Sequence, residues 1–91
     1  MKFEWDEAKR RSNLTRHGID FAELAELFTG LTLDFSDNRF DYGEQRVVTL
    51  GLFRGRVVVV VHTGIDDNIR VISARRALKH EEITYFKEIW D

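Results

Sequence analysis

The chain contains no cysteine and no proline, and it has no long run of uncharged apolar residues. The lack of cysteine excludes disulfide bonds and thiolate metal sites, which fits a cytoplasmic protein. The lack of a long apolar run excludes a membrane-spanning helix, and the first six residues become acidic where a signal peptide needs an apolar core. With no linker and no repeat, residues 1–91 are expected to form a single domain.

Histidine is scarce as well, and this limits the chemistry available to the chain. The three histidines do not have the spacing of a zinc site such as His-x3-His. No Ser-His-Asp or thiol arrangement can be argued from the sequence either. The sequence therefore predicts neither a bound metal ion nor a cofactor.

The formal net charge of −2 argues against a protein that coats itself in nucleic acid, but the charges are unevenly distributed. Two segments, residues 9–17 and 70–80, contain several cations and no acid. These cations are Lys9, Arg10, Arg11, Arg16, Arg70, Arg75, Arg76 and Lys79. If the two segments meet in space, they form a local anion-binding site on an otherwise acidic body.

Residue patterns predict an α+β fold in which β-α-α is followed by a four-strand antiparallel meander and a C-terminal helix. Strands are expected at residues 3–5, 31–35, 45–53, 56–63 and 70–76, and helices at 7–17, 21–28 and 79–90. Asp6 is a good N-cap for the first helix, and Gly18 is placed to end it. The valine-rich strand 56–63 is expected to be central, with both of its faces covered.

Several finer features follow from the same patterns. Strict alternation along 70–76 puts Val71 and Arg75 on one face of the sheet and Arg70 on the other. Gly51 indicates a bulge in its strand. The segment 36–43 is expected to be a mobile loop with solvated aspartates, and 64–68 a tight turn. The residues of the last helix expected to face inward are Ile83, Phe86 and Trp90.

The polar residues allow both a structural and a functional interpretation. Lys9, Asn13, Arg16 and His17 share one face of the first helix, which is either a solvated face or part of a site. Arg75 and Arg76 are adjacent in a strand, so their side chains diverge. One of them can serve a cleft while the other pairs with a structural carboxylate, and a forked guanidinium suits a phosphate.

An arginine-rich cleft beside a histidine or lysine suits RNA cleavage. In that reaction the ribose 2′-hydroxyl attacks the adjacent phosphate, which requires a base, a cation that stabilises the phosphorane and an acid for the leaving 5′-oxygen. No metal ion is required. His62, by contrast, shares a strand face with Val58 and Val60 and is expected to be structural.

Motifs spread over nearly the whole chain carry a family resemblance. They are Phe-Glu-Trp-Asp at 3–6, Ala-Lys at 8–9, Ser-Asn-Leu at 12–14, His-Gly at 17–18, Gly-Glu-Gln-Arg at 43–46, His-Thr at 62–63 and Arg-Val-Ile-Ser-Ala-Arg-Arg-Ala at 70–77. In combination these motifs resemble the BrnT family, toxins of bacterial type II toxin-antitoxin pairs. The resemblance implies a RelE-like fold, an endoribonuclease that halts translation, and a BrnA-like antitoxin whose ribbon-helix-helix part binds operator DNA.

Carried onto this chain, the resemblance implies catalytic roles for Arg75, Arg70, His17 and Lys9. Arg75 and Arg70 would bind the scissile phosphate, and His17 or Lys9 would transfer a proton. The residues expected to bind the RNA substrate are Arg46, Arg76, Asn13 and Lys79. Two alternatives stay open: a module that binds RNA or protein without cutting it, and a co-repressor that acts only with a DNA-binding antitoxin.

Overall fold

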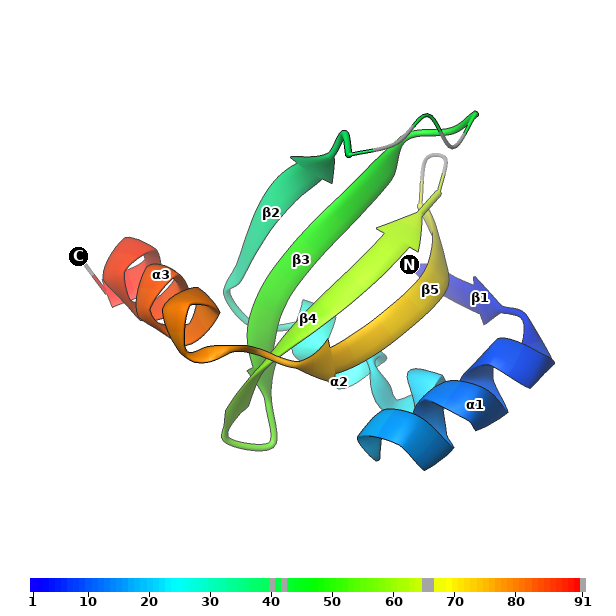
Figure 1. The fold of residues 1–91 in the computed structure, drawn as a ribbon, viewed down its shortest axis with the longest axis horizontal. Coiled ribbons are helices and arrows are strands. Elements are labelled where there is room, and N and C mark those ends of the chain that lie inside the picture. The colour runs from blue at the N-terminus through cyan, green and yellow to red at the C-terminus, as the bar shows by residue number, and fades with distance from the viewer. Residues whose placement is uncertain (40, 42, 65–66, 91) are drawn as a thin grey trace.

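The computed structural model describes residues 1–39, 41, 43–64 and 67–90. The described residues form five β-strands, three α-helices and one short 3-10 helix (Figure 1). In chain order these elements are β1 (Lys2–Trp5), α1 (Glu7–His17), the 3-10 helix η1 (Phe21–Glu23), α2 (Ala25–Phe28), β2 (Thr32–Asp37), β3 (Arg46–Phe53), β4 (Arg56–Thr63), β5 (Asn68–Arg76) and α3 (Lys79–Trp90). The α+β class expected from the sequence is confirmed.

The signals at the two ends of α1 act as the sequence predicts. The carboxylate of Asp6 accepts a hydrogen bond from the backbone N–H of Lys9 at 3.1 Å, which satisfies a free amide of the first turn. Gly18 ends the helix in the left-handed region at φ 71°, and its N–H bonds to the carbonyl of Leu14.

The helix expected at residues 21–28 is instead divided into η1 and α2. The carboxylate of Asp20 accepts a hydrogen bond from the N–H of Ala22, and the N–H of Leu24 bonds to the carbonyl of Phe21, three residues back. This spacing winds the first turn more tightly than an α-helix does.

The five strands form one sheet in the order β1-β5-β4-β3-β2. β1 runs parallel to β5, and the other neighbouring strands are antiparallel. Between β3 and β4 the chain reverses through Arg54 and Gly55, whose φ angles of 53° and 82° are both positive, as a two-residue turn of this kind requires. β4 lies in the middle of the sheet, as the valine pattern predicted.

The bulge lies in β5 and not at Gly51. Val71 pairs with His62 while Ser73 pairs with Val61, so Ile72 is an extra residue in the ladder. Strict alternation along β5 is therefore wrong: Val71 and Ala74 lie in the same core cluster, and Arg75, the next residue after Ala74, does not share the face of Val71.

The register of β3 with β4 is unbroken at Gly51, so the bulge expected there is wrong. A glycine is needed at this position for a different reason. A Cβ atom on Gly51 would lie 2.7 and 2.8 Å from side-chain atoms of Leu27, which packs directly on the strand.

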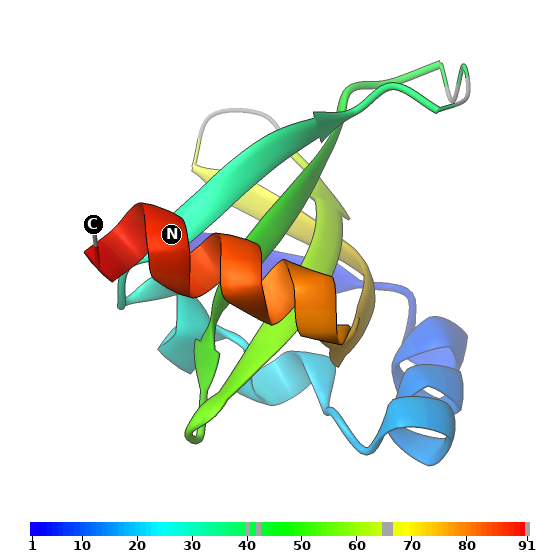
Figure 2. The same cartoon turned by 60° about the vertical axis from the view of Figure 1, so that its left-hand side comes forward.

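Helices pack on both faces of the sheet (Figure 2). On one face, residues of η1 and α2 pack against β4 and β5 in a cluster that includes Phe21, Leu24, Leu27, Val58 and Val60. The opposite face packs against α3 through a second cluster, formed by Leu50, Val57, Val59 and Tyr85. Helix α1 lies beside β5, past the end of the short strand β1 (Figure 1).

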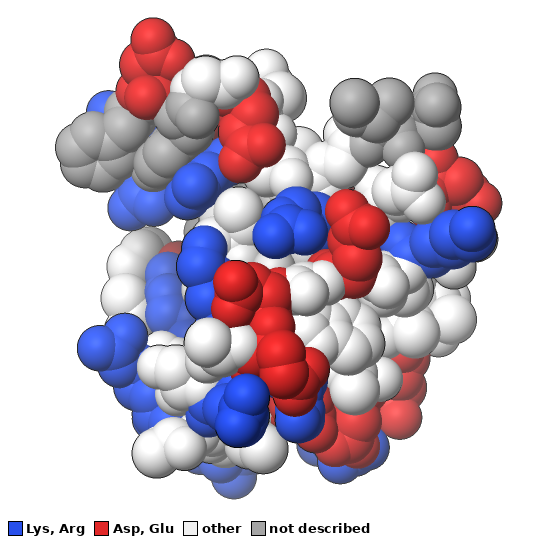
Figure 3. Space-filling model, turned by 90° about the vertical axis from the view of Figure 1, so that its right-hand side faces the viewer, with Lys and Arg blue, Asp and Glu red and all other residues white. Residues whose placement is uncertain are grey.

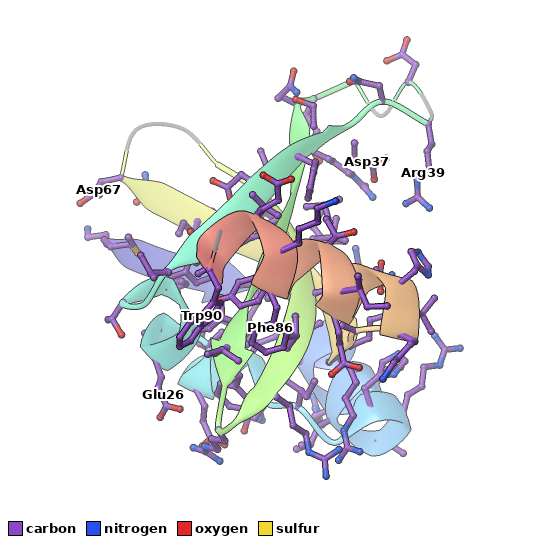
Figure 4. The ribbon with its side chains drawn as sticks, turned by 90° about the vertical axis from the view of Figure 1, so that its left-hand side faces the viewer. Glu26, Asp37, Arg39, Asp67, Phe86 and Trp90 are labelled. Atoms are coloured by element: carbon purple, nitrogen blue, oxygen red, sulfur yellow. The ribbon has the colours of Figure 1, made fainter. Side chains whose placement is uncertain are left out.

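The inner face of α3 differs from the predicted one. Ile83, Phe86 and Trp90 are 57%, 41% and 76% exposed, whereas Tyr85 is buried and Ile89 packs against the core. In Figure 4, Phe86 and Trp90 extend from the same side of α3. Tyr85 and Ile89, four residues apart, face the sheet. The helix expected at residues 79–90 is therefore present, but a different side of it faces the core from the side that was predicted.

The beginning of the acidic segment 36–43 belongs to a strand and not to a loop. Strand β2 extends to Asp37, which is 6% exposed and forms an ion pair of 2.9 Å with Arg39 (Figure 4). The expectation that the aspartates of this segment are solvated is therefore wrong for Asp37. The expected loop 36–43 and turn 64–68 also include Phe40, Tyr42, Ile65 and Asp66, which lie outside the described residues.

Within the described part of the chain, no helix combines the length and apolar character that crossing a membrane requires.

Candidate functional site

The side chain of Asn13 fixes the end of α1 against β5. Asn13 is 7% exposed, and its amide nitrogen donates to the carbonyls of Ile19 and Ala74 at 3.1 and 2.9 Å. Its amide oxygen accepts from the N–H of Ala74 at 3.1 Å. Because β1 ends at the residue paired with Val71, this amide takes the place of a further strand along the edge of β5.

The hydrogen bonds of Asn13 bring the two basic segments, residues 9–17 and 70–80, together. Arg16, His17, Arg75, Arg76 and Leu78 line one hollow between the end of α1 and the end of β5. A second hollow, beside the β3–β4 turn, shares two of these residues, His17 and Arg76. Residues of the segments 9–17 and 70–80 therefore lie side by side at this end of β5, as expected from the sequence.

We call Arg16, His17, Arg56 and Arg76 the basic cluster. Within the part of the chain that the structure describes, no acidic side chain forms an ion pair or hydrogen bond with any of the four. His17 is half-buried and the three arginines are exposed. Arg16 also lines a shallow hollow with Lys9, Ser12 and Ser73, so the positive surface continues along α1.

Figure 3 looks onto the side of the molecule that carries β1 and α1. Lys and Arg side chains gather along its left margin, and Asp and Glu side chains form a band through the middle. An acidic protein can therefore present a concentrated positive surface to an anion.

Arg75 is engaged differently from its neighbour. Two of its guanidinium nitrogens donate to Glu81 at 2.8 and 3.0 Å, in a bidentate pair. The hydrogen bonds from Arg75 hold the pKa of Glu81 below its usual range. Glu81 also accepts from the N–H of Leu78 at 2.8 Å, so one carboxylate fixes both Arg75 and the start of α3. Of the two adjacent arginines, Arg75 therefore pairs with a structural carboxylate, as expected of one of them, although both side chains line the same hollow.

Three other predicted site residues do not line the hollows that contain the basic cluster. Arg70 lies near the opposite end of β5, where its guanidinium is 3.8 Å from the carboxylate of Glu4. Arg75 is five positions after Arg70, which is roughly 16 Å along an extended strand. Arg46 begins β3 opposite Asp37, and Lys79 begins α3 with an exposed side chain.

The profile of one protein family, described as a ribonuclease toxin, BrnT, of type II toxin-antitoxin systems, matches residues 5–81. The match spans most of the 91 residues, including α1 and the whole sheet from Trp5 onward. The chain belongs to the BrnT family. No curated protein sequence matches it.

Membership of the BrnT family makes the chain a toxin whose partner is an antitoxin. Most of the predicted BrnT site residues lie in or beside the region of the basic cluster: Lys9, Asn13, His17, Arg75 and Arg76. Arg56 was not among the predicted site residues, and Arg16 was placed only on the helix face interpreted as either solvated or part of a site. Arg56 lies on the same face of β4 as Val58, and Val58 pairs with Arg76 of β5. The register of the β4–β5 hairpin therefore brings Arg56 to the same face as Arg76, and a correct register would have identified Arg56 as a site residue.

The second of the three histidines in this BrnT chain, His62, is half-buried and makes structural contacts, as expected. Its Nε2 is 2.7 Å from the hydroxyl of Thr49, which in turn donates to Asp34 at 2.7 Å. The ring of His62 also packs edge-on against Phe28. Burial lowers the pKa of His62, and the nearby charge of Asp34 opposes this effect.

Among the described residues, no three His, Asp or Glu side chains gather into a group that could hold a metal ion.

Proposed function

We propose that this toxin is an endoribonuclease that cuts RNA at the basic cluster without a metal ion and thereby inhibits translation in the cytoplasm. The observation that carries the proposal is the placement of three arginines around His17, at the junction of α1 and β5, none of them paired with an acidic side chain among the described residues. A dianionic phosphorane needs fixed positive charge, and these arginines supply it. A RelE-like fold is part of this proposal, and the α+β arrangement of one five-stranded sheet with helices supports it.

In the proposed reaction, the 2′-hydroxyl attacks the adjacent phosphate and the 5′-oxygen leaves. Arg76 and Arg16 hold the phosphate oxygens, where charge develops in the transition state. His17 gives its proton to the leaving 5′-oxygen. Lys9 lines the neighbouring hollow along α1 together with Arg16. It is the candidate base that takes the proton from the attacking 2′-hydroxyl.

Arg75 takes a supporting role in this proposal. Its bidentate pair with Glu81 holds the end of β5 and the start of α3 together, next to Arg76. Asn13 likewise acts by positioning, because both ends of its amide are hydrogen-bonded to backbone groups. Arg70 and Arg46 lie toward the other end of the sheet and are proposed to contact RNA further along its path. Lys79, exposed at the start of α3, is also proposed to contact RNA.

The test compares Arg76→Ala and His17→Ala with Arg11→Ala. Arg11 is also exposed on α1 but lies on the opposite side from Asn13, so its removal is a matched loss of one positive charge. Expression of the wild type and of Arg11→Ala is expected to stop growth and fragment RNA, and the other two variants are expected to lose both effects. Equal toxicity of folded Arg76→Ala would remove the basic cluster from the mechanism.

A second assay separates a nuclease from a binder. Purified protein is incubated with RNA in excess EDTA, and both the length of the RNA and its binding are followed. Cleavage in EDTA supports the metal-independent reaction. Tight binding of intact RNA would instead favour the non-catalytic module.

The partner proposed for this toxin is a BrnA-like antitoxin with a ribbon-helix-helix part, which would link the pair to operator DNA. We propose that an acidic segment of the antitoxin covers the basic cluster. An adjoining reading frame that encodes such a protein is the simplest test. The purified complex is then expected to protect the cluster, so that RNA cleavage is lost in the complex and returns when the antitoxin is degraded.

A further inference from the structure

The hollow beside the β3–β4 turn has a composition of its own. It is lined by His17, Gly18, Ile19, Phe53, Arg54, Arg56, Val58 and Arg76, and it holds about 190 Å³. Its apolar residues are nearly inaccessible, with Ile19 5%, Phe53 8% and Val58 2% exposed. A floor of buried apolar side chains under a rim of cations suits a flat, polar-edged group better than a phosphate alone.

Arg54 forms one wall of this hollow and is held in place by several contacts. Its guanidinium lies over the ring of Phe53, 4.8 Å from the ring centroid. The same group forms ion pairs with the carboxylates of Glu23 and Glu26. A guanidinium plane fixed in this way is a surface on which an unstacked RNA base can stack.

The hollow also adjoins the proposed cleavage site. It shares His17 and Arg76 with the hollow that contains Arg16 and Arg75. A nucleotide whose phosphate lies between Arg16 and Arg76 therefore has its neighbouring base beside the apolar floor. The size of the hollow, below the roughly 300 Å³ of a drug-sized ligand site, allows one base and excludes a folded RNA element.

Hydrogen-bonding capacity at the rim distinguishes among the bases. Arg56 and Arg76 present N–H donors only, and none of the described side chains that line the hollow carries a carboxylate or amide oxygen. Guanine offers two adjacent acceptors, O6 and N7, which match an arginine fork. Adenine places an amino group beside N7, and cytosine also presents an amino donor.

We infer that this hollow is a base-binding subsite that selects guanine at a nucleotide flanking the cut phosphate. The inference rests on the proposed ribonuclease function and names the part of the RNA that the site recognises. In this arrangement Arg56 reads O6 and N7, Arg54 stacks on the base, and the floor of Ile19 and Val58 excludes water from the contact.

The test uses oligonucleotides with a single cleavable linkage, made by keeping one ribose among deoxyriboses. The base on each side of that linkage is varied in turn. With the wild type, guanine at one flanking position is expected to increase the cleavage rate about tenfold or more over adenine, the range of one bidentate base contact. Inosine, which keeps O6 and N7, is expected to behave as guanine, and 7-deazaguanine, which lacks N7, is expected to lose the advantage.

Arg56→Gln is expected to lower the ratio of guanine to adenine cleavage rates to one or below, because a glutamine amide matches N6 and N7 of adenine, while Arg11→Ala keeps the wild-type ratio. Cleavage with no preference for a flanking base, or a preference unchanged by Arg56→Gln, would overturn the subsite and leave the nuclease standing. If no RNA is cut, the proposed function fails instead. In that case the base-binding subsite is tested separately, by titrating the protein with GMP or AMP and monitoring the NMR signals of Ile19 and Val58. Stronger binding of GMP than of AMP supports the subsite, and equal binding rejects it.

Discussion

Replacement of Asn13 by alanine tests the contact on which the candidate site depends. The substitution removes three hydrogen bonds between the amide and the backbone of Ile19 and Ala74. Two buried carbonyls and one buried N–H then lose their partner. At about 1 kcal/mol for each net hydrogen bond, the expected loss of unfolding free energy is about 3 kcal/mol.

Urea denaturation of the wild type and of Asn13→Ala measures this loss directly. For a domain of this size, the same change is expected to lower the melting temperature by more than about 10 °C. Ser12→Ala, an exposed neighbour on the same helix, is the matched control and is expected to change stability by less than about 0.5 kcal/mol. A loss below about 1 kcal/mol for Asn13→Ala would show that the amide does not hold α1 against β5.

Asn13→Asp adds a pH dependence whose sign is fixed by the geometry. The new carboxyl is buried and faces two carbonyl acceptors, at Ile19 and Ala74, but only one N–H donor, that of Ala74, so its ionised form is disfavoured and its pKa is raised on folding. A group whose pKa is raised on folding binds its proton more tightly in the folded state, so stability increases as the pH falls. The variant is therefore expected to be more stable at about pH 5 than at pH 7, relative to the wild type, and an opposite slope would contradict the orientation of the amide.

Three further predictions concern the core. Gly51→Ala should cost about 1–3 kcal/mol, because the new methyl group collides with the buried side chain of Leu27; a neutral result in denaturation would mean that Leu27 moves freely. His62, whose pKa is lowered on folding, should make the protein less stable as the pH falls below the pKa of a free histidine, and His62→Gln should lack this component. Tyr85→Phe should cost about 1 kcal/mol through its lost hydrogen bond, whereas Trp90→Ser, at a side chain 76% exposed, should cost less than about 0.5 kcal/mol. The reverse order of these two costs would contradict the orientation of α3.

Local signals in the sequence were sufficient for most of the elements. The side chain of Asp6 and the freedom of Gly18 to adopt a positive φ set both ends of α1, because caps act within a few residues. The valine run of β4 likewise indicated a strand covered on both faces. These features depend on neighbours in the chain, so they can be read without a structure.

Features that depend on distant partners were missed or misplaced. Phe86 and Trp90 are more hydrophobic than most of α3, yet the buried position belongs to Tyr85, whose hydroxyl donates to the carbonyl of Leu31. That carbonyl is 54 positions away in sequence, and no local pattern points to it. The bulge at Ile72 is a similar case, because it is defined by pairing with β4.

The candidate site shows the same division. Sequence alone indicated that one of two adjacent arginines would take a carboxylate, but only the structure shows that Glu81 binds Arg75 and leaves Arg76 facing the hollow. Arg70 was grouped with them because it is close in sequence. A strand is extended, however, and five residues along β5 are enough to separate two functional groups.

The short length of β1 has a consequence for how the protein behaves at high concentration. β1 pairs only with Asn68–Val71, and a bare edge on the rest of β5 would offer its N–H and C=O groups to a strand of another molecule. The side chain of Asn13 occupies the groups of Ala74, and the polar helix α1 stands in front of them. The same contact that assembles the site therefore protects the chain from edge-to-edge aggregation while it is still free of its antitoxin.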